Sequence, residues 1–255
     1  MKTNEILQSY LPGTVAEKNI VVTGGTAGIG RAIAVLLAQL GANVLIAGRT
    51  EEHLANALKE AADQQYPGRF EGIVADLSTR QGVTKLFAEI DQRFTQLDVF
   101  INNAALAAEG IDEGSFDEYE DVVKSNLLNY IACSHEAFAR MKEFNAGHII
   151  NVGSMSADIK KAGSSVYTAT KSGIQGFTES LRKEVNEAGI KVTLIEPGLV
   201  GTDMPENSAE EQQKQQEELK MLKAEDIAVA IYYALIQPKR CDVVGIKIRP
   251  HLQLI

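Results

Sequence analysis

The sequence contains little of what marks disulfide-stapled, metal-binding or membrane-spanning proteins. It has two cysteines, Cys133 and Cys241, far apart and outside any Cys-x-x-Cys pair, and four scattered histidines without metal-ligand spacing. Its apolar runs fall short of the roughly 18 residues that suggest a transmembrane helix, and its first residues show no apolar signal core. We therefore expect a cytoplasmic protein with free thiols, no metal site and no membrane partner.

Positive charge is also in short supply. The 255 residues include 25 Lys and Arg against 34 Asp and Glu, which gives a net charge of −9. An acidic surface disfavours binding to nucleic acid, which requires clustered basic side chains. The hydrophobic fraction of 45% and the charged fraction of 23% are those of a globular protein. We expect an N-terminal arm over residues 1–18 and a single domain over residues 19–255.

Short runs rich in β-branched residues alternate with longer segments of helical periodicity. Strands are expected over residues 19–23, 44–47, 72–75, 99–101, 148–152, 191–195 and 242–248. Helices are expected over residues 29–40, 51–65, 82–94, 116–144, 165–188 and 224–236. This alternation predicts an α/β fold with a mostly parallel sheet covered by helices on both faces. Such sheets bind ligands beyond the carboxyl ends of their strands, so the turns after the strands are where a site is expected.

The first expected strand runs into a glycine-rich turn, Thr23-Gly24-Gly25-Thr26-Ala27-Gly28-Ile29-Gly30. Glycine permits a tight turn and close approach of a ligand, and the helix that follows begins with unpaired N–H groups at its positive dipole end. These features predict a pyrophosphate site, with Gly24, Thr26, Gly28, Ile29 and Gly30 as its residues. The alternative is an ordinary glycine-rich turn, which the position between a strand and a helix disfavours.

The second expected strand ends in Ala47-Gly48-Arg49-Thr50. This segment lacks the carboxylate that accepts a hydrogen bond from the ribose 2′-hydroxyl in folds that bind NAD. Arg49 instead offers a guanidinium suited to a phosphate. The pattern favours NADP(H) over NAD(H), with the adenosine 2′-phosphate on Arg49. The alternative is a solvent-facing arginine, and the nearby Glu51 and Glu52 weaken the phosphate interpretation.

Three further turns supply candidate contacts to the cofactor. After the third strand, Asp76 is expected either to bind the adenine amino group or to cap the next turn, with Leu77 beside it. After the fourth strand, the adjacent side chains of Asn102 and Asn103 are expected to brace the sheet edge and contact the ribose, and Asn103 and Ala104 are the expected cofactor contacts. After the sixth strand, a Pro-Gly turn leaves backbone groups for the nicotinamide carboxamide, and the expected contacts are Pro197, Gly198, Val200 and Thr202.

The fifth strand leads to Ser154, and a helical Tyr167-x3-Lys171 pair follows. Positions i and i+4 share one helix face, so the phenol and the ammonium are expected in the same crevice. An ordinary tyrosine has a pKa of about 10, and a neighbouring ammonium favours its phenolate. Tyr167 is therefore the candidate general acid and base, Ser154 would hold a carbonyl oxygen, and Lys171 would also reach the cofactor ribose.

Other segments leave alternatives open. Asn126 lies inside an expected helix, where asparagine is unfavourable, and it either passes protons through water to Lys171 or faces solvent. Residues 205–223, rich in Glu, Gln and Lys, form either a lid over the substrate or a solvated surface helix. Lys160 and Lys161 either attract an acidic substrate or form a solvated pair. The residues expected to line an apolar pocket are Ala105, Leu106, Met155, Ile159 and Leu199.

As a set, these motifs resemble the short-chain dehydrogenase/reductase family in its single-domain form. The resemblance runs from about Asn19 to the C-terminus and rests on the TGGTAGIG turn, Asp76, the NNA segment, Asn126, Ser154, the segment from Tyr167 to Lys171, and PGLVGTDM. It implies a doubly wound, seven-stranded Rossmann fold and a catalytic tetrad of Asn126, Ser154, Tyr167 and Lys171. It also implies a homodimer or homotetramer that pairs through the helices carrying Asn126 and Tyr167.

Three features depart from the family pattern. Ala105 stands where glycine usually follows NNA, and its methyl group narrows the crevice near the cofactor. Ala27 stands where some NADP-binding members have a second basic residue, so Arg49 is expected to act alone. The chain continues through Arg249 and Pro250 without the Gly-Gly tail that is usual in the family. A contact from the C-terminus to a neighbouring subunit is therefore not expected on the basis of the resemblance.

The sequence therefore predicts an NADP(H)-dependent oxidoreductase that acts on the CH–OH group of an alcohol or on the corresponding ketone or aldehyde. The main alternative is a catalytically inactive dinucleotide-binding regulator or scaffold, but such a protein has no need of all four tetrad residues. An isomerase on the same fold is a third alternative. Neither the substrate nor the direction of the reaction is readable from the sequence.

Overall fold

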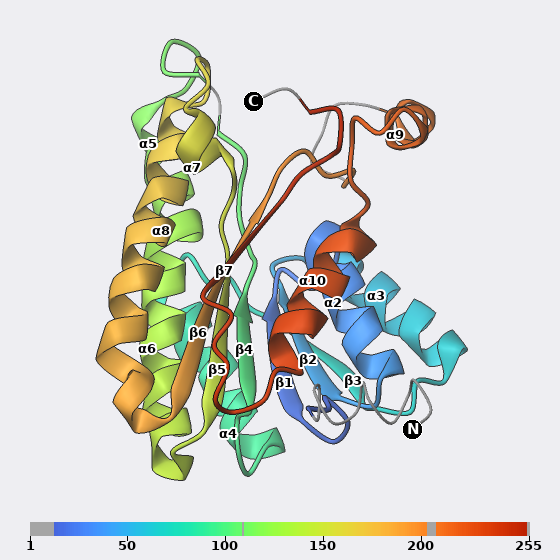
Figure 1. The fold of residues 1–255 in the computed structure, drawn as a ribbon, viewed down its shortest axis with the longest axis vertical. Coiled ribbons are helices and arrows are strands. Elements are labelled where there is room, and N and C mark those ends of the chain that lie inside the picture. Colours follow the sequence, from blue (N-terminus) through green and yellow to red (C-terminus); the bar gives the residue numbers. More distant parts are fainter. Residues whose placement is uncertain (1–12, 109, 203–207, 254–255) are drawn as a thin grey trace.

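The computed structural model describes residues 13–108, 110–202 and 208–253, in which a twisted sheet lies between two helical layers (Figure 1). All seven strands are parallel, in the order β3-β2-β1-β4-β5-β6-β7. The predicted doubly wound α/β Rossmann fold is thus confirmed, and its mostly parallel sheet is parallel throughout. The strands are β1 (Asn19–Thr23), β2 (Asn43–Gly48), β3 (Phe70–Val74), β4 (Val99–Asn102), β5 (Gly147–Val152), β6 (Ile190–Pro197) and β7 (Gly245–Ile248).

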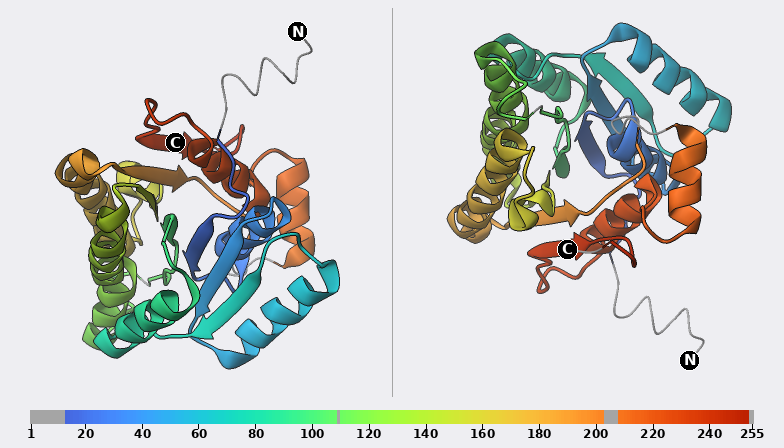
Figure 2. Two further views of the ribbon diagram at one scale, coloured as in Figure 1. Left: turned by 90° about the horizontal axis from the view of Figure 1, so that it is seen from below. Right: turned by 90° about the horizontal axis from the view of Figure 1, so that it is seen from above.

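The two helical layers bury opposite faces of the sheet, as the two end views show (Figure 2). Successive side chains of a strand point to opposite faces, so Ile20 and Val22 enter one core and Val21 enters the other. The first core is covered by α2 (Gly28–Gln39), α3 (Glu51–Gln64) and α10 (Ala224–Leu235). The second is covered by α4 (Arg80–Arg93), α6 (Asn129–Met141) and α8 (Ser165–Val185). Because both faces are buried there, the central strands β1, β2, β4 and β5 are mostly apolar.

The structure divides the single helix that the pattern predicts over residues 116–144. It begins as α5 (Phe116–Val123), widens into the π-helical turn η1 (Lys124–Leu128), continues as α6 and ends in the short 3₁₀ turn η2 (Lys142–Phe144). In the wide turn the N–H of Asn129 donates to the carbonyl of Lys124, five residues back. Helical periodicity does not reveal such a turn, and π-turns of this kind are frequent at functional sites.

Smaller differences occur near the second half of the sheet. Strand β7 begins at Gly245 rather than at residue 242. Before it, the N–H of Cys241 donates to the carbonyl of Pro238 in a turn. The short helix α7 (Ser156–Ile159) was not predicted, since four residues are too few to show a period. A 3₁₀ turn, η3 (Asn186–Ala188), follows α8. In the tract 205–223, α9 (Ala209–Glu217) buries no residue, and residues 205–207 lie outside the described residues.

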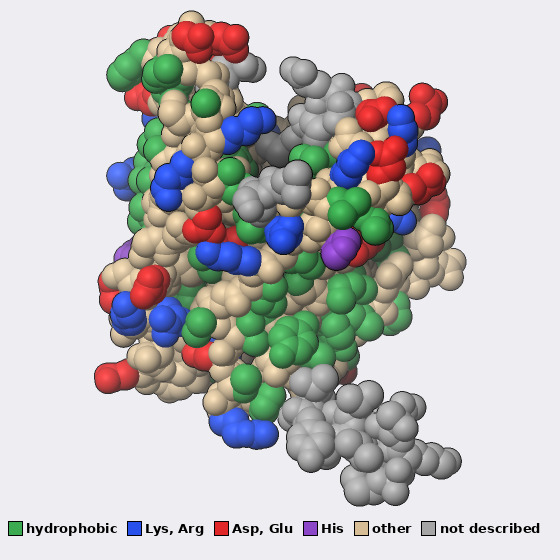
Figure 3. Space-filling model, turned by 45° about the horizontal axis from the view of Figure 1, so that its top comes forward, with side chains coloured by type: hydrophobic (Ala, Val, Ile, Leu, Met, Phe, Trp, Pro, Cys, Tyr) green, Lys and Arg blue, Asp and Glu red, His purple; other side chains and the backbone are tan. Residues whose placement is uncertain are grey.

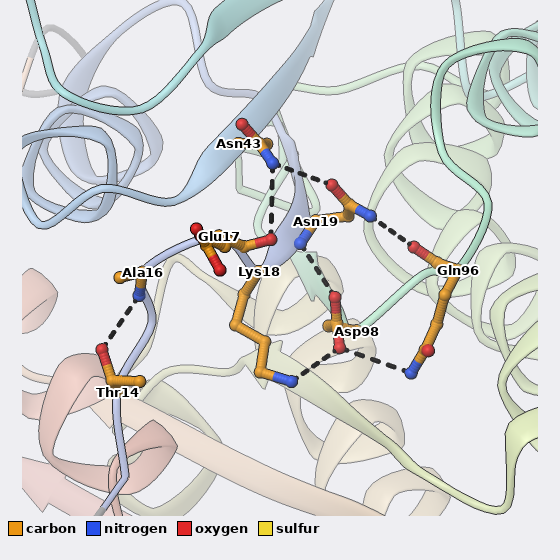
Figure 4. Close-up of polar contacts among 8 residues, drawn as sticks. All are labelled: Thr14, Ala16, Glu17, Lys18, Asn19, Asn43, Gln96 and Asp98. Carbon is orange, nitrogen blue, oxygen red and sulfur yellow. Dashed lines mark hydrogen bonds and ion pairs between the residues drawn. The ribbon is translucent and has the colours of Figure 1, made fainter.

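Residues 13–18, the described part of the expected N-terminal arm, contact the domain (Figure 4). Val15 is buried in the first core. The ammonium of Lys18 lies 2.9 Å from one carboxylate oxygen of Asp98, whose other oxygen accepts the N–H of Asn19. The side chain of Asn43 donates to the carbonyl of Glu17. Residues 1–12 lie outside the described residues, so the division of the chain at residue 18 stays a prediction.

Candidate active site

The carboxyl ends of the strands border a cleft of about 720 Å³, which opens at the upper edge of the space-filling view (Figure 3). Segments from both halves of the sheet meet there, because the strand order reverses between β1 and β4. Sixteen of the eighteen predicted site residues line the cleft, and Gly30 and Asn126 do not. The sixteen are Gly24, Thr26, Gly28, Ile29, Arg49, Asp76, Leu77, Asn103, Ala104, Ser154, Tyr167, Lys171, Pro197, Gly198, Val200 and Thr202.

The glycine-rich turn is held close to the start of α2. Gly24 and Gly28 adopt φ values of +64° and +51°, which favour glycine. Gly30 packs beneath the turn rather than on the cleft wall. A methyl group at position 30 would lie 2.2 Å from the carbonyl oxygen of Gly24. The side chain of Asn103 donates to the carbonyls of Thr23 and Gly24 and braces the turn. Backbone N–H groups at the start of α2 are therefore presented to the cleft, where an anion could bind them.

The adenosine end of this cleft is formed by the turns after β2 and β3. The side chain of Arg49 is exposed there, and no described acidic residue forms an ion pair with it. His53, on the first turn of α3, lines the same wall and was missed by the sequence reasoning, although it lies at position i+4 from Arg49. Asp76 accepts hydrogen bonds from the N–H and hydroxyl of Ser78, at 3.0 and 2.7 Å. Its turn-capping role is therefore present in the structure.

Ser154, Tyr167 and Lys171 converge at the other end of the cleft. The side chains of Ser154 and Tyr167 both line this part of the cleft, and the Ser154 side chain acts on the phenol to lower its pKa. The ammonium of Lys171 is buried, donates to the carbonyl of Val152 at 3.0 Å, and lies 5.6 Å from the centre of the Tyr167 ring. The i, i+4 spacing on α8 thus brings the phenol and the ammonium to the same wall of the cleft.

Burial dominates the electrostatics of this pair. It raises the pKa of Tyr167 above its ordinary value, and the Ser154 side chain opposes that shift. Burial also lowers the pKa of Lys171 to about 7. The expected depression of the tyrosine pKa by the ammonium is therefore not produced by the protein's own groups, because the lysine is itself only partly charged at neutral pH.

Comparison with known proteins places the chain in a family. A family model described as short chain dehydrogenase matches residues 18–213. The chain belongs to the short-chain dehydrogenase/reductase family. Within this family, an uncharacterized oxidoreductase of Staphylococcus aureus (strain USA300) is 35% identical over 237 residues, which cover 92% of this chain and 98% of that protein.

Two further comparisons agree with this membership. Human dehydrogenase/reductase SDR family member 11 is 34% identical to this chain over 245 residues, covering 92% of the chain and 94% of the human protein. The crystal structure of a metagenomic short-chain oxidoreductase in complex with NADP covers 94% of this chain and 99% of its own, with a TM-score of 0.79 and 24% identity. The structural likeness supports the short-chain dehydrogenase fold.

Asn126 of this short-chain dehydrogenase is fully buried in the wide turn η1. Its carboxamide oxygen accepts the N–H of Leu106 at 2.7 Å, and its carboxamide nitrogen donates to the carbonyl of Leu106 at 2.8 Å. The solvent-facing alternative is therefore wrong. These two hydrogen bonds hold in place the segment after β4, which forms one wall of the cleft. They use both the oxygen and the nitrogen of the Asn126 side chain.

Tyr130 is a buried residue of the site that the sequence reasoning missed. Its hydroxyl donates to the carbonyl of Val152 at 3.1 Å, the same oxygen that Lys171 binds. Its ring centre lies 5.5 Å from the Lys171 ammonium. The ammonium therefore contacts two aromatic rings, those of Tyr130 and Tyr167. The spacing contained a signal, because Tyr130 follows Asn126 at i+4.

The substrate end of the cleft contains all five residues of the predicted apolar pocket. The lining residues at this end are Ala105, Leu106, Met155, Ser156, Ile159, Leu199 and Gln253. Lys160 and Lys161 are exposed and do not line the cleft, as expected of the solvated pair. No residue of α9 lines it either, so α9 itself is a surface helix, whereas Met221 later in the same tract is buried. Gln253 was missed because a C-terminal residue carries no motif.

Among the described residues, no group of three or more His, Cys, Asp or Glu side chains is arranged to hold a metal ion. The same part of the chain has no helix with the length and apolarity needed to cross a membrane. Both cysteines are free thiols, Cys133 within the second core and Cys241 partly exposed.

Proposed function

We propose that this family member is an NADP(H)-dependent oxidoreductase, moving a hydride between the nicotinamide and a ketone, aldehyde or secondary alcohol, with Tyr167 as general acid and base. The observation that carries the proposal is the meeting of Ser154, Tyr167 and Lys171 in the same cleft as the glycine-rich turn, with the Lys171 ammonium 5.6 Å from the centre of the tyrosine ring. A regulator that only bound a dinucleotide would not require these three groups to meet.

The residues present fit a dinucleotide cofactor. The turn at Gly24 and Gly28 borders the cleft where a pyrophosphate would bind, and Arg49 offers a 2′-phosphate a guanidinium that no described acidic residue pairs with. The remaining contacts are proposed for Thr26, Ile29, Asp76, Leu77, Asn103, Ala104, Tyr167, Lys171, Pro197, Gly198, Val200 and Thr202, with Gly30 packing beneath them. When bound, the nicotinamide supplies or accepts the hydride.

The proton transfer is carried out by residues of this chain. In the reductive direction Tyr167 donates a proton to the carbonyl oxygen, and the Ser154 hydroxyl holds that oxygen. Because burial raises the pKa of Tyr167, the hydroxyl is protonated at neutral pH and ready to act as an acid. The Lys171 ammonium stabilises the phenolate that forms. Asn126 has a positioning role, because its hydrogen bond to the Leu106 N–H holds that part of the cleft wall in place.

Replacement of Tyr167 by phenylalanine tests the proposal. It removes the proton donor and keeps the ring, so kcat with NADPH and a panel of ketones and aldehydes should fall at least about 100-fold. The dissociation constant of NADPH, measured by its fluorescence, should change less than about threefold. Tyr233→Phe, which alters an exposed tyrosine on α10, serves as the control.

Two outcomes would contradict the proposal in different ways. Full turnover by Tyr167→Phe would remove Tyr167 as the acid. A wild-type protein that binds NADPH but turns over no ketone, aldehyde, sugar or hydroxy acid of the panel would favour the inactive regulator.

We also propose a homodimer or homotetramer, with pairing through the helices that carry Asn126 and Tyr167. Exposed apolar side chains on that side of the molecule support it: Val123, Leu128 and Ile131. Light scattering that detected only monomers would contradict it. The two unpaired cysteines support a cytoplasmic location, and the acidic composition supports small-molecule partners without nucleic acid.

A further inference from the structure

Charged side chains are distributed unevenly in the cleft. Arg49, His53 and Asp76 follow β2 and β3, at the adenosine end. Lys171 is the one other Asp, Glu, Lys, Arg or His among the described lining residues, and its ammonium is bound to the carbonyl of Val152. Apart from Lys171, whose ammonium is occupied in this way, the described lining at the substrate end is uncharged. A substrate carboxylate, phosphate or ammonium group would lose its hydration there without meeting a counter-ion.

Charges just behind this wall are already paired with one another. The ammonium of Lys247 on β7 lies 2.5 Å from the carboxylate of Asp158 on α7. It also lies 3.8 Å from the carboxylate of Glu196, which is buried at the end of β6 and accepts a hydrogen bond from the Gln175 side chain. This cluster joins α7, α8, β6 and β7 behind the substrate end, and none of its members lines the cleft.

Gln253 brings the C-terminal tail to the substrate end. Its side-chain oxygen accepts the N–H of Leu199 at 3.1 Å. It also covers Gly198 so closely that a methyl group at that position would lie 2.3 Å from the same oxygen. The tail is fixed on both sides, since the Leu252 N–H donates to the carbonyl of Leu219 and the Arg249 guanidinium donates to the carbonyl of Gln253.

The contact with Leu199 also fixes which end of the Gln253 amide is free. A backbone N–H requires an acceptor, so the oxygen must face Leu199 and the –NH₂ group must point away. No described residue accepts a hydrogen bond from this –NH₂ group. An amide that lines a cleft with its donor end unpaired is suited to binding an acceptor on a ligand.

We infer that the substrate is an uncharged carbonyl compound with a second hydrogen-bond acceptor, such as an ester or amide carbonyl, and that the –NH₂ group of Gln253 binds this acceptor. The inference rests on the proposed reductase function and adds the class of substrate to it. Gln253 thus acts as a specificity residue, separate from the proton transfer at Tyr167.

Three ketones of similar intrinsic reactivity test the inference: 2-octanone, ethyl 4-oxopentanoate and the 4-oxopentanoate anion. The ketone in each is insulated from the far end by at least two methylene groups, so differences in kcat/KM report recognition of that end. With NADPH, the anion should be at least about tenfold poorer than its ester, as expected for an unpaired ion. The ester should also exceed 2-octanone.

Two variants of Gln253 separate its two hydrogen bonds. Gln253→Glu keeps an oxygen for the Leu199 N–H but removes the donor, whereas Gln253→Leu removes both. Both variants should lower the ratio of kcat/KM for ester over 2-octanone by about 3- to 10-fold, the range of one neutral hydrogen bond. The dissociation constant of NADPH, from its fluorescence, should change less than about twofold. Gln237→Leu, at the far end of α10, is the matched control.

Several results would overturn the inference while leaving the reductase intact. These are faster turnover of the anion than of the ester, an unchanged ratio in Gln253→Glu, or a change confined to NADPH binding. The last result would assign the Gln253 donor to the cofactor. Failure to turn over any of the three ketones, or any other carbonyl compound, would instead contradict the proposed function itself.

Discussion

At the scale of single residues, the environment of Lys171 governs the site. Its ammonium is buried away from water. It donates a hydrogen bond to the Val152 carbonyl and lies against the rings of Tyr130 and Tyr167. Aromatic faces attract cations, and more strongly where water is excluded. The pKa of about 7 means that the ammonium loses its proton as the pH rises through neutrality. We therefore expect kcat/KM for NADPH, which reports the free enzyme, to decline above pH about 7.

Tyr130 should set the position of that decline. Tyr130→Leu removes an aromatic face, which makes the ammonium less favourable and moves the decline to lower pH. Tyr130→Phe keeps the ring and loses only the hydroxyl contact with Val152, so its profile should stay closer to wild type. The measurement is kcat/KM for NADPH against pH at saturating ketone. A Leu variant with the wild-type profile would show that the ring does not stabilise the charge.

Arg49 carries a separate prediction about the cofactor. A charge-assisted contact to a 2′-phosphate should be lost in Arg49→Ala, weakening NADPH binding by roughly tenfold or more. Binding of NADH, which has no 2′-phosphate, should change little. Fluorescence titration with both cofactors measures this, and Arg240→Ala provides a control arginine. Equal loss for both cofactors, or a wild-type preference for NADH, would refute the assignment.

Residues that were predictable and residues that were not differ in a physical way. Ser154, Tyr167 and Lys171 reach the cleft because strand ends and i, i+4 spacing determine where side chains point. Gln253 reaches the cleft through tertiary packing, which local spacing does not report. Tyr130 contacts Lys171 behind the cleft, and its i+4 spacing from Asn126 does not by itself reveal that contact. The pKa directions also required the structure, because they follow from burial, which raises the pKa of Tyr167 and lowers that of Lys171.

At the scale of elements, the junction between the glycine-rich turn and α2 shows how close packing shapes the site. In Gly30→Ala, the new methyl group would lie 2.2 Å from the Gly24 carbonyl oxygen and 2.4 Å from the Asn103 side chain. The turn must shift, so we expect a loss of about 1–3 kcal/mol in the free energy of unfolding and weaker NADPH binding. Urea denaturation and fluorescence titration measure the two effects.

Gly176→Ala on α8 is the matched control, because its methyl group meets no atom within 4 Å. It should stabilise the protein by about 0.5–1 kcal/mol, the usual gain for this change inside a helix. If both variants had the same effect, close packing at Gly30 would not be the reason for its glycine.

The periodic elements follow from the sequence, whereas the irregular ones do not. The strands β1, β2, β4, β5 and β6 and the helices that cover them are buried on a regular face, which hydrophobic spacing records. The wide turn η1 interrupts a segment whose periodicity continues on both sides. Its position became clear only from the pairing of Asn126 with Leu106, a contact between residues twenty positions apart.

At the scale of the whole molecule, pH dependence of stability arises far from the cleft. His148 on β5 is buried, its ring shares a hydrogen bond with Thr193 on β6, and burial together with the nearby charge of Lys191 lowers its pKa to about 3. The unfolded chain binds a proton at His148 below pH about 6.5, and the folded protein does not. Stability contributed by the neutral ring is therefore lost progressively as the pH falls from about 6.5 toward 3.

This single group should contribute a slope of up to about 1.4 kcal/mol per pH unit over that window. His148→Gln, which cannot be protonated, should flatten the dependence of the free energy of unfolding on pH between about 6 and 4. Urea denaturation at several pH values measures it, with His135→Gln on the exposed side of α6 as control. Carboxylates with lowered pKa values, such as Asp158, also make the folded protein less stable as the pH falls. They are present in both the wild type and His148→Gln. An identical slope in wild type and His148→Gln would therefore mean that the carboxylates alone produce the acid sensitivity.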